Sequence, residues 1–446
     1  MYKFFIILFC LLSFPTFASN TNDTSLQTEV KLSPPEIIKL TRSFFESGKI
    51  DEAKLLLQNI TFDEKEFEIE RLFLLGQIAK YEDDFDTAIK YFRSILNDYP
   101  NLARVRMELA TTYMLNQSWL KADYNLRLAS SEDIPEVVNE NIKRMLFIIR
   151  QNKNYNFWFN MGIAPDNNIN NAQAGSQCIS TIFGILCNEL PEPEKSVGFN
   201  LSFGGDYEAR LSDNFRLRND FAVFGSLYDK KKYDDLYVSF STGPKYVYSK
   251  GDIWTALTMS KRWLGHKSYN DTLGFKLQTS YDFSRRFSIL FGFNYIPTHY
   301  DEYKMLDGEI INSNIILSYI LNSSSYLRFK IGIENENTQD EIYTNTKSNY
   351  ALGIGGELPY EFNIYVEPSI QYINYDNERS FVKDFTFTNI KEKSIIRKYS
   401  ISLANKKIDI YGFSPTITYS YTDKNSNVWQ NEYTKSAIEF TMTQRF

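Results

Sequence analysis

The chain has 446 residues, which at roughly 150 residues a domain suggests about three domains, unless one large β-barrel takes up most of the length. Acidic residues outnumber basic ones by 55 to 49 and the net charge is −6, which argues against a nucleic-acid-binding protein. Mean hydropathy is −0.37, and after the N-terminus no apolar run reaches the roughly 18 residues of a membrane helix, which excludes a helical membrane protein. Only two histidines are present, which excludes a His-rich metal centre. With 16% aromatic residues, a soluble β-protein or an outer-membrane barrel remains.

Residues 1–18 have the pattern of a secretory signal peptide. A short basic start precedes an apolar stretch from Phe4 to Phe14, and Thr16 and Ala18 stand at the two positions that signal peptidase reads. The pattern predicts cleavage after Ala18 and export from the cytoplasm. Cys10 is preceded by Leu8 and Phe9 rather than by small residues, so lipoprotein processing at Cys10 is not expected.

Two cysteines, Cys178 and Cys187, remain in the predicted mature chain. In an oxidising compartment, two cysteines nine residues apart can close a small disulfide loop, which we expect here; a pair of free thiols is the alternative. Their spacing is not that of a zinc site.

Residues 30–150 are predicted to form a helical repeat domain. Apolar residues recur at three- and four-residue spacing, and small residues recur about 34 positions apart. These positions resemble the tetratricopeptide repeat, in which small residues stand where two helices cross closely. The predicted packing positions are Gly76, Ala88, Phe92, Ala110 and Ala122.

Such repeats usually bind a partner on the concave face that the first helix of each repeat lines. The predicted groove residues are Phe73, Gln77, Lys80, Arg104, Met107, Thr111 and Met114. The alternative is that Phe73, Met107 and Met114 simply pack between repeats.

Residues 155–446 change to a period of two, which is typical of β-strands. In segments such as 199–204 and 289–295, apolar or aromatic side chains alternate with polar ones. A soluble barrel points its apolar face inward, whereas an outer-membrane barrel points it toward lipid. Alternation alone therefore leaves both classes open.

The connections favour the membrane class, because short turns alternate with longer loops. We predict about fourteen strands, which start near Tyr155, Ser196, Phe215, Leu236, Ile253, Tyr269, Phe287, Glu309, Tyr326, Asn349, Phe362, Ile395, Tyr411 and Thr434. Tight turns are expected near 212–214, 250–252, 284–285, 322–324, 359–361 and 406–407. Longer loops are expected at 164–195, 228–235, 296–308, 335–348, 374–394 and 423–433. An even strand count puts both chain ends, and the helical domain, in the periplasm.

The last strand carries Phe440, Met442 and Phe446 in one period-two set. A terminal aromatic residue on an amphipathic last strand resembles the signal that the outer-membrane insertion machinery reads. Eight strands leave a filled interior and 16 to 18 leave an aqueous channel, so about fourteen predicts a gated or plugged lumen. The residues expected to face this lumen include Lys245, Lys261, Arg328, Lys330 and Glu439.

The junction between the two regions carries the most specific pattern. An aromatic stretch, Phe157-Trp158-Phe159, leads to a motif that reads Pro165-Asp166-Asn167-Asn168-Ile169-Asn170. Together with the signal peptide, the short repeat domain and the barrel, this motif resembles the surface lipoprotein assembly modifier family, the outer-membrane translocators of type XI secretion. Asn167 stands where the family often has Ser. One hypothesis is that Asn168 and Asn170 fix the first loop into the lumen and shape a gate; the other is that they cap a turn.

The resemblance implies an outer-membrane translocator, not an enzyme, for a surface lipoprotein or a secreted soluble protein, often one that captures iron or haem. The helical domain would engage the client or a periplasmic chaperone. No cofactor is implied, and no nucleotide-binding loop of the Gly-x-x-x-x-Gly-Lys-Ser/Thr type occurs in the sequence. An exopolysaccharide exporter, a passive porin and an outer-membrane enzyme using His266 and Ser268 are the alternatives.

Overall fold

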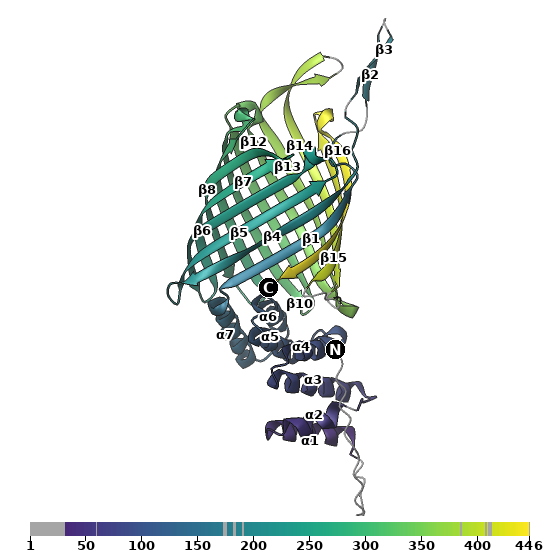
Figure 1. Ribbon diagram of the computed structural model, residues 1–446, viewed down its shortest axis with the longest axis vertical. Coiled ribbons are helices and arrows are strands. Elements are labelled where there is room, and N and C mark those ends of the chain that lie inside the picture. The colour runs from purple at the N-terminus through teal and green to yellow at the C-terminus, as the bar shows by residue number, and fades with distance from the viewer. Residues whose placement is uncertain are drawn as a thin grey trace, which may run out of the picture.

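The computed structural model describes residues 32–58, 60–172, 176–181, 184–189, 191–383, 386–405, 408 and 413–445. In these ranges seven helices precede a closed β-barrel, and the helices lie beyond one end of it (Figure 1). The helices are α1 (Pro34–Glu46), α2 (Ile50–Gln58), α3 (Lys65–Tyr81), α4 (Phe85–Asp98), α5 (Ala103–Leu115), α6 (Trp119–Ala129) and α7 (Glu136–Asn152). The predicted signal peptide lies outside the described residues.

Local sequence explains where several helices begin. Ser33 and Glu36 form a capping box at the start of α1, and Asp84 accepts a hydrogen bond of 3.1 Å from the backbone N–H of Thr87 at the start of α4. None of the helices in the described ranges is long and apolar enough to cross a membrane.

The helices pack in antiparallel pairs where small residues permit close approach. A Cβ atom added at Gly76 of α3 would lie only 2.6 Å from Cε1 of Phe92 in α4, so this crossing requires glycine. Phe92, Ala88, Ala110 and Ala122 are fully buried. The predicted packing residues therefore lie inside the helical stack, while its assignment as a tetratricopeptide domain stays a prediction.

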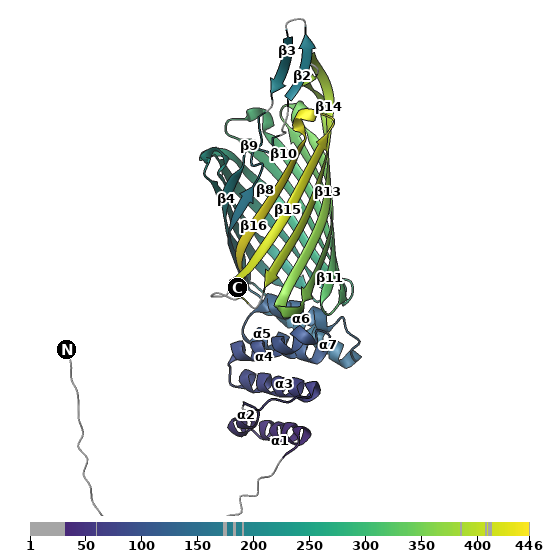
Figure 2. The same cartoon turned by 90° about the vertical axis from the view of Figure 1, so that its right-hand side faces the viewer.

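Fourteen antiparallel strands close the barrel, with β1 paired to both β4 and β16, which confirms the predicted fold class. A separate hairpin, β2–β3, projects away from the barrel at the end opposite the helices (Figures 1 and 2). The strands are β1 (Tyr155–Asp166), β2 (Ser176–Thr181), β3 (Gly184–Glu189), β4 (Ser196–Arg210), β5 (Phe215–Tyr228), β6 (Asp235–Tyr248), β7 (Gly251–Leu264), β8 (Lys267–Asp282), β9 (Phe287–Tyr300), β10 (Gly308–Asn322), β11 (Ser325–Thr338), β12 (Asn345–Leu358), β13 (Phe362–Lys383), β14 (Thr386–Asn405), β15 (Ser414–Ser426) and β16 (Tyr433–Arg445).

The barrel has an apolar outer face and a polar inner face, as expected for an outer-membrane barrel. Leu257 and Leu273 point outward and are 63% and 64% exposed. Residues paired across neighbouring strands share a face, which places Lys245, Arg328, Lys330 and Glu439 in the lumen, as predicted.

Lys261 is a correction to the sequence prediction. It pairs with Val238 and Asp271 and shares the face of Leu257 and Met259, so it points outward. The predicted register was one residue off there, and a slip of one residue reverses the face of a strand.

Most of the short turns lie at the end of the barrel next to the helices, and most of the longer loops lie at the other end. The two-residue turn between β7 and β8 is an exception, because it lies at the end away from the helices. The predicted loop 374–394 is wrong, because β13 and β14 continue their pairing as far as Lys383 and Thr386, nine residues before the predicted start at Ile395. The predicted loop 164–195 contains the β2–β3 hairpin. The predicted turn at 406–407 and the predicted strand start at Tyr411 lie outside the described residues.

Candidate functional site

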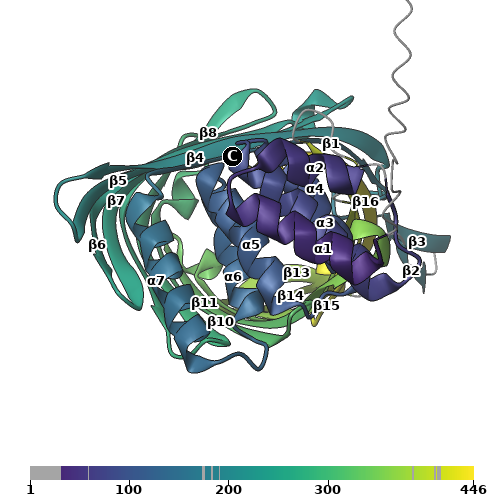
Figure 3. The same ribbon diagram turned by 90° about the horizontal axis from the view of Figure 1, so that it is seen from below.

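The helical stack lies across the barrel mouth that carries the short turns (Figure 3). Two arginines of the stack reach acidic residues at the end of β12 and in the turn after it. Arg93 of α4 forms an ion pair with Glu361, and Arg106 Nη2 of α5 lies 2.9 Å from Glu357 Oε2. Only 1% of the Arg106 side chain is exposed, so this ion pair belongs to a closed interface between the two domains.

A second anchor is Asp282, the last residue of β8. It forms ion pairs with Arg127 of α6, at 3.0 Å, and with Arg150 of α7. Asp123, one turn before Arg127, and Asp282 together raise the pKa of Arg127 above its ordinary value. One barrel carboxylate therefore holds two helices at the mouth.

Residues in the turns of the barrel also contact the helices. Arg285 Nη2 lies 2.5 Å from Glu136 Oε2, and Arg286 donates to the backbone carbonyl of Ser131. The backbone N–H of Ser323 donates to Glu132 Oε1 at 3.1 Å. Contacts from three separate turns, 283–286, 323–324 and 359–361, fix the stack on the mouth.

A cavity of about 1040 Å³ lies between α4–α6 and the strands β9 to β15. Burial raises the pKa of Tyr113 to about 12, and burial also raises the pKa of Tyr124. The helical residues that line the cavity include Arg93, Arg106, Tyr113, Tyr124 and Arg127, and the barrel residues that line it include Phe287, Tyr319, Tyr326, Arg328, Glu357, Glu361 and Tyr365. Aromatic rings and paired charges thus line a chamber that opens between the stack and the lumen wall.

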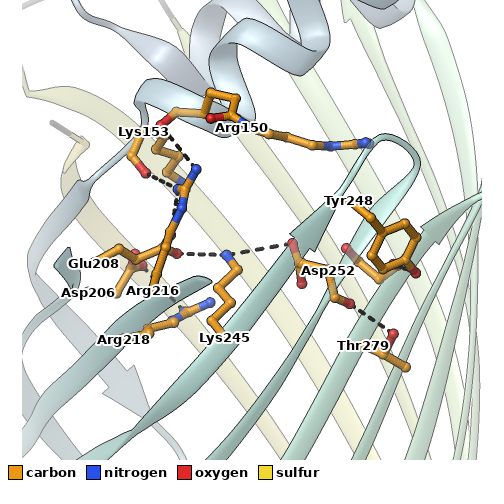
Figure 4. Close-up of polar contacts among 12 residues, drawn as sticks. Arg150, Lys153, Asp206, Glu208, Arg216, Arg218, Lys245, Tyr248, Asp252 and Thr279 are labelled. Atoms are coloured by element: carbon orange, nitrogen blue, oxygen red, sulfur yellow. Dashed lines mark hydrogen bonds and ion pairs between the residues drawn. The ribbon is translucent and has the colours of Figure 1, made fainter. Parts of the chain in front are cut away.

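The linker from α7 to β1 is fastened inside the mouth (Figure 4). Arg216 of β5 is 2% exposed and donates to the backbone carbonyls of Gln151 at 3.0 Å and Lys153 at 3.2 Å. Its guanidinium also donates to Glu208 Oε2 at 2.8 Å, and Lys245 Nζ lies 2.7 Å from the other oxygen of Glu208. We call Glu208, Arg216 and Lys245 the linker latch.

Further charges continue from the linker latch along the lumen wall. The guanidinium of Arg218 and the ammonium group of Lys276 lie 4.3 and 4.7 Å from the ring centre of Trp254, which is fully buried. Burial lowers the pKa of Lys153, although Asp206 and Glu208 oppose that shift. Charged and aromatic side chains that contact one another therefore line the barrel wall next to α7.

The junction motif lies at the other end of β1, where it ties β1 to β16. Asn168 is 2% exposed; its amide donates to the carbonyl oxygens of Thr434 at 3.0 Å and Ala172 at 2.8 Å, and its oxygen accepts from Ala172 N–H at 2.9 Å. Asp166 Oδ2 lies 2.6 Å from Lys435 Nζ. Pro165 and Ile169 flank these two polar residues along the chain.

Asn170 closes the base of the first loop. Its side chain bonds the carbonyl of Glu192 at 2.8 Å and the N–H of Glu194 at 2.9 Å. The hypothesis that the motif directs this loop into the lumen is wrong, because the β2–β3 hairpin above it points away from the barrel (Figures 1 and 2). The motif instead joins loop ends and strand ends by side-chain hydrogen bonds.

The remaining residues predicted from the barrel sequence lie in several places. Phe440 and Met442 pair with Ile163 and Met161 at the β1–β16 junction, and Phe440 is 49% exposed on the outer face. Phe446 lies outside the described residues. Cys178 and Cys187 are directly opposed in the β2–β3 hairpin, so the backbone permits the predicted disulfide.

The predicted groove of the helical domain needs one correction. Phe73 is 3% exposed and packs in the hydrophobic core of the helices, and the guanidinium of Arg104 lies 4.5 Å from the centre of its ring. Met107 and Met114 are partly buried against the same core, as the packing alternative proposed. Lys80 pairs with Glu108, Thr111 donates to the carbonyl of Met107, and Gln77 is half-buried.

His266 and Ser268 bond different carboxylates. His266 Nε2 lies 2.7 Å from Asp234 Oδ2, and Ser268 donates to Asp301 Oδ2 at 2.5 Å. His266 has a φ of +67° in the tight turn between β7 and β8. Both residues are used to hold neighbouring loops together.

Sequence reasoning missed the residues that join the two domains. Arg106 had a visible signal, since it is a charged residue between the apolar positions Val105 and Leu109 of a helix. Glu208, Arg216 and Asp282 had none, because their partners lie far away in the sequence.

Residues 155–446 match the model of the family described as surface lipoprotein assembly modifier. The chain belongs to that family. Surface lipoprotein assembly modifiers from Pasteurella multocida and Haemophilus influenzae (number 2) are 21% and 22% identical to it, covering 83% and 81% of this chain and 75% and 74% of theirs.

Another relative is named hemophilin secretion modulator, from Acinetobacter baumannii. It is 20% identical, and the match covers 84% of this chain and 78% of that protein. Among solved structures, the outer membrane channel DcaP of Acinetobacter baumannii is 7% identical with a TM-score of 0.39, covering 66% of this chain and 97% of that one, a likeness too low to add to the family assignment.

Proposed function

We propose that this member of the surface lipoprotein assembly modifier family exports a protein client across the outer membrane, and that its helical domain receives the client in the periplasm. The observation that carries the proposal is the docking of the helical stack on the barrel mouth, with a 1040 Å³ cavity between them. A client that enters the lumen from this side must first meet α4–α6. A periplasmic chaperone that delivers the client is a natural partner of the same surface.

The names of the relatives support both kinds of client. The relatives from Pasteurella multocida and Haemophilus influenzae are named for surface lipoproteins, and the relative from Acinetobacter baumannii is named for the secretion of hemophilin. The polar lumen suits a polypeptide chain, because hydroxyl and amide side chains offer weak and replaceable hydrogen bonds. Pairs such as Ser241 with Thr258 and Ser402 with Thr418 line opposite parts of the wall.

The test compares cells with and without the gene. Intact cells are treated with protease, and the surface peptides, the medium and the whole cells are analysed by mass spectrometry. We expect one lipoprotein to leave the surface, or one soluble protein to leave the medium, while it accumulates inside the cell. Unchanged proteins with reduced small-solute uptake would favour a porin, and loss of surface polysaccharide would favour an exopolysaccharide exporter.

The periplasmic position of the helical domain is tested by cysteine labelling. In a Cys178→Ser/Cys187→Ser background, single cysteines at Leu55 and Phe387, which are 68% and 84% exposed, report on the helices and on the β13–β14 hairpin. A membrane-impermeant maleimide should label Phe387→Cys in intact cells and Leu55→Cys only after the outer membrane is opened. Labelling of Leu55→Cys in intact cells would contradict the proposed orientation.

A further inference from the structure

The barrel is closed by the pairing of its first and last strands, and this seam is not continuous. On its other side, β1 pairs with β4 without interruption from Tyr155 to Asp166. Toward β16 it pairs from Trp158 to Ile163 and again only at Asp166, so Ala164 and Pro165 have no partner across the seam.

The break has a chemical cause. The N–H of Asn167 donates to the carbonyl of Ser436 at 3.3 Å, and residues two apart on a strand direct their N–H groups to the same side. By this alternation, residue 165 should donate its backbone N–H to the carbonyl of Ile438. Residue 165 is proline, which has no backbone N–H. Pro165 removes one backbone hydrogen bond from the seam.

Above the break, side chains add to the backbone hydrogen bond from Asn167 to Ser436. Asp166 pairs with Lys435 at 2.6 Å, Asn168 donates to Thr434, and Asn167 Oδ1 accepts from Ser436 N–H at 2.8 Å. Such contacts can be released one at a time, because none of them requires the strands to separate along their length.

The break at Ala164–Pro165 separates the polar lumen from the apolar outer face of the barrel. On the lumen side, Asn200 bonds Glu439 at 2.8 Å and Ser226 at 2.9 Å. On the outer face, Ile163 and Ile438 are 52% and 40% exposed. A parting of β1 and β16 at this point would connect the polar lumen directly with the membrane, near the end of the barrel opposite the helices.

We propose that the β1–β16 seam opens at Ala164–Pro165 and lets the acyl chains of a lipoprotein client pass sideways from the lumen into the membrane. This inference rests on the proposed export function and adds the route of the lipid anchor. Moving each methylene group of an acyl chain from water into the membrane lowers the free energy. A lateral exit lets the acyl chains reach the membrane without crossing the polar outer loops.

The test locks the seam with a disulfide. Asn160 and Thr443 are directly opposed across β1–β16, and the hydrogen-bond pattern makes them a non-hydrogen-bonded pair, whose Cα separation of about 4.5 Å suits a disulfide. The matched control is Met161→Cys with Leu201→Cys, an equivalent pair across β1–β4. We expect the oxidised Asn160→Cys/Thr443→Cys chain to lose surface display of the lipoprotein and to regain it on reduction, while the control displays it in both states.

A second variant weakens opening without a crosslink. Pro165→Ala supplies the missing N–H, and one added hydrogen bond shifts an opening equilibrium about fivefold toward the closed seam. We expect display to fall by a similar factor, with unchanged heat-modifiable migration of the folded barrel on gels.

The outcomes separate the two proposals. If the unmodified chain displays no protein, the export function itself fails. If it displays a lipoprotein and the oxidised seam variant displays as much, the lateral route is wrong and the export function stands. If every client is soluble, no acyl chain needs the seam, and the lateral route is again wrong.

Discussion

Arg106 and Glu357 form an ion pair of 2.9 Å although 251 residues separate them in the sequence. Arg106 belongs to a helix and Glu357 to a barrel strand, and the guanidinium is almost completely buried. The pair shows that the helical stack is packed against the barrel through a buried charge, and that the two parts are not simply joined by a linker.

The first prediction concerns this pair. Glu357→Gln removes the charge that balances a buried guanidinium, and we expect docking of the helices to weaken by about 1–3 kcal/mol. In planar bilayers the variant should conduct ions more often than the unmodified chain, because the stack leaves the mouth more frequently. Glu334→Gln, which breaks a lumen pair with Lys347 of β12, is the control. Equal conductance of both variants would show that docking does not govern the mouth.

The second prediction concerns the linker latch. Glu208→Gln leaves the buried Arg216 and Lys245 without their shared carboxylate, and loss of one partner of a buried pair costs about 3–5 kcal/mol. We expect a lower unfolding temperature of the barrel, measured by its heat-modifiable migration on gels. Asp213→Asn breaks an exposed pair with Arg210 at the next turn and should change nothing measurable. The same unfolding temperature for both variants would contradict the role of the latch.

The third prediction concerns the crossing of α3 and α4. Gly76→Ala places a methyl group against the buried Phe92 ring, and overpacking costs about 1–3 kcal/mol, more than the roughly 1 kcal/mol that alanine gains in a helix. Far-UV circular dichroism should show earlier melting of the helices while the barrel stays folded. Gln77→Ala, on the half-buried neighbouring position, should melt like the unmodified chain. A more stable Gly76→Ala variant would mean that Phe92 can move aside.

The fourth prediction separates the two asparagines of the junction motif. Asn168→Ala leaves the Thr434 carbonyl and the Ala172 N–H without their bonds to that side chain, which costs about 2–3 kcal/mol. Asn170→Ala affects only the base of the loop and should cost about 1 kcal/mol. Barrel unfolding temperatures measure both. If the Asn168→Ala/Asn170→Ala double variant exports its client at the level of the unmodified chain, the motif has no gating role.

The fifth prediction concerns pH. Hydrogen bonds from Lys230 and Lys232 lower the pKa of Glu194 from its ordinary 4.5 to about 2. Since the folded pKa lies below the unfolded one, the stabilisation is complete above pH 4.5 and is lost as the pH falls through about 2. Hydrogen-exchange mass spectrometry should show faster exchange of residues 229–234 at pH 2 than at pH 5, after correction for intrinsic rates. Glu194→Gln should remove this difference, and its persistence in that variant would point to another group.

The sequence predicted much of the fold because its signals are periodic and local. The period of two gave the strands and their faces along most of the barrel, and the spacing of small residues indicated where helices cross, as at Gly76 and Phe92. It failed where periodicity gives no boundary: β13 and β14 continue through a segment whose polar residues suggested a loop. At Lys261 a shift of one residue reversed the predicted face.

By itself, then, the sequence determined a helical domain followed by a fourteen-stranded outer-membrane barrel, and it carried the motif that resembles the family. These features depend on residues close together in the chain, whose patterns report local geometry. Only the tertiary structure decided that Arg106 meets Glu357, that Arg216 holds the linker, and that Pro165 interrupts the seam with β16. Each of these joins residues far apart in sequence, and a single charged or cyclic side chain carries no mark of its distant partner.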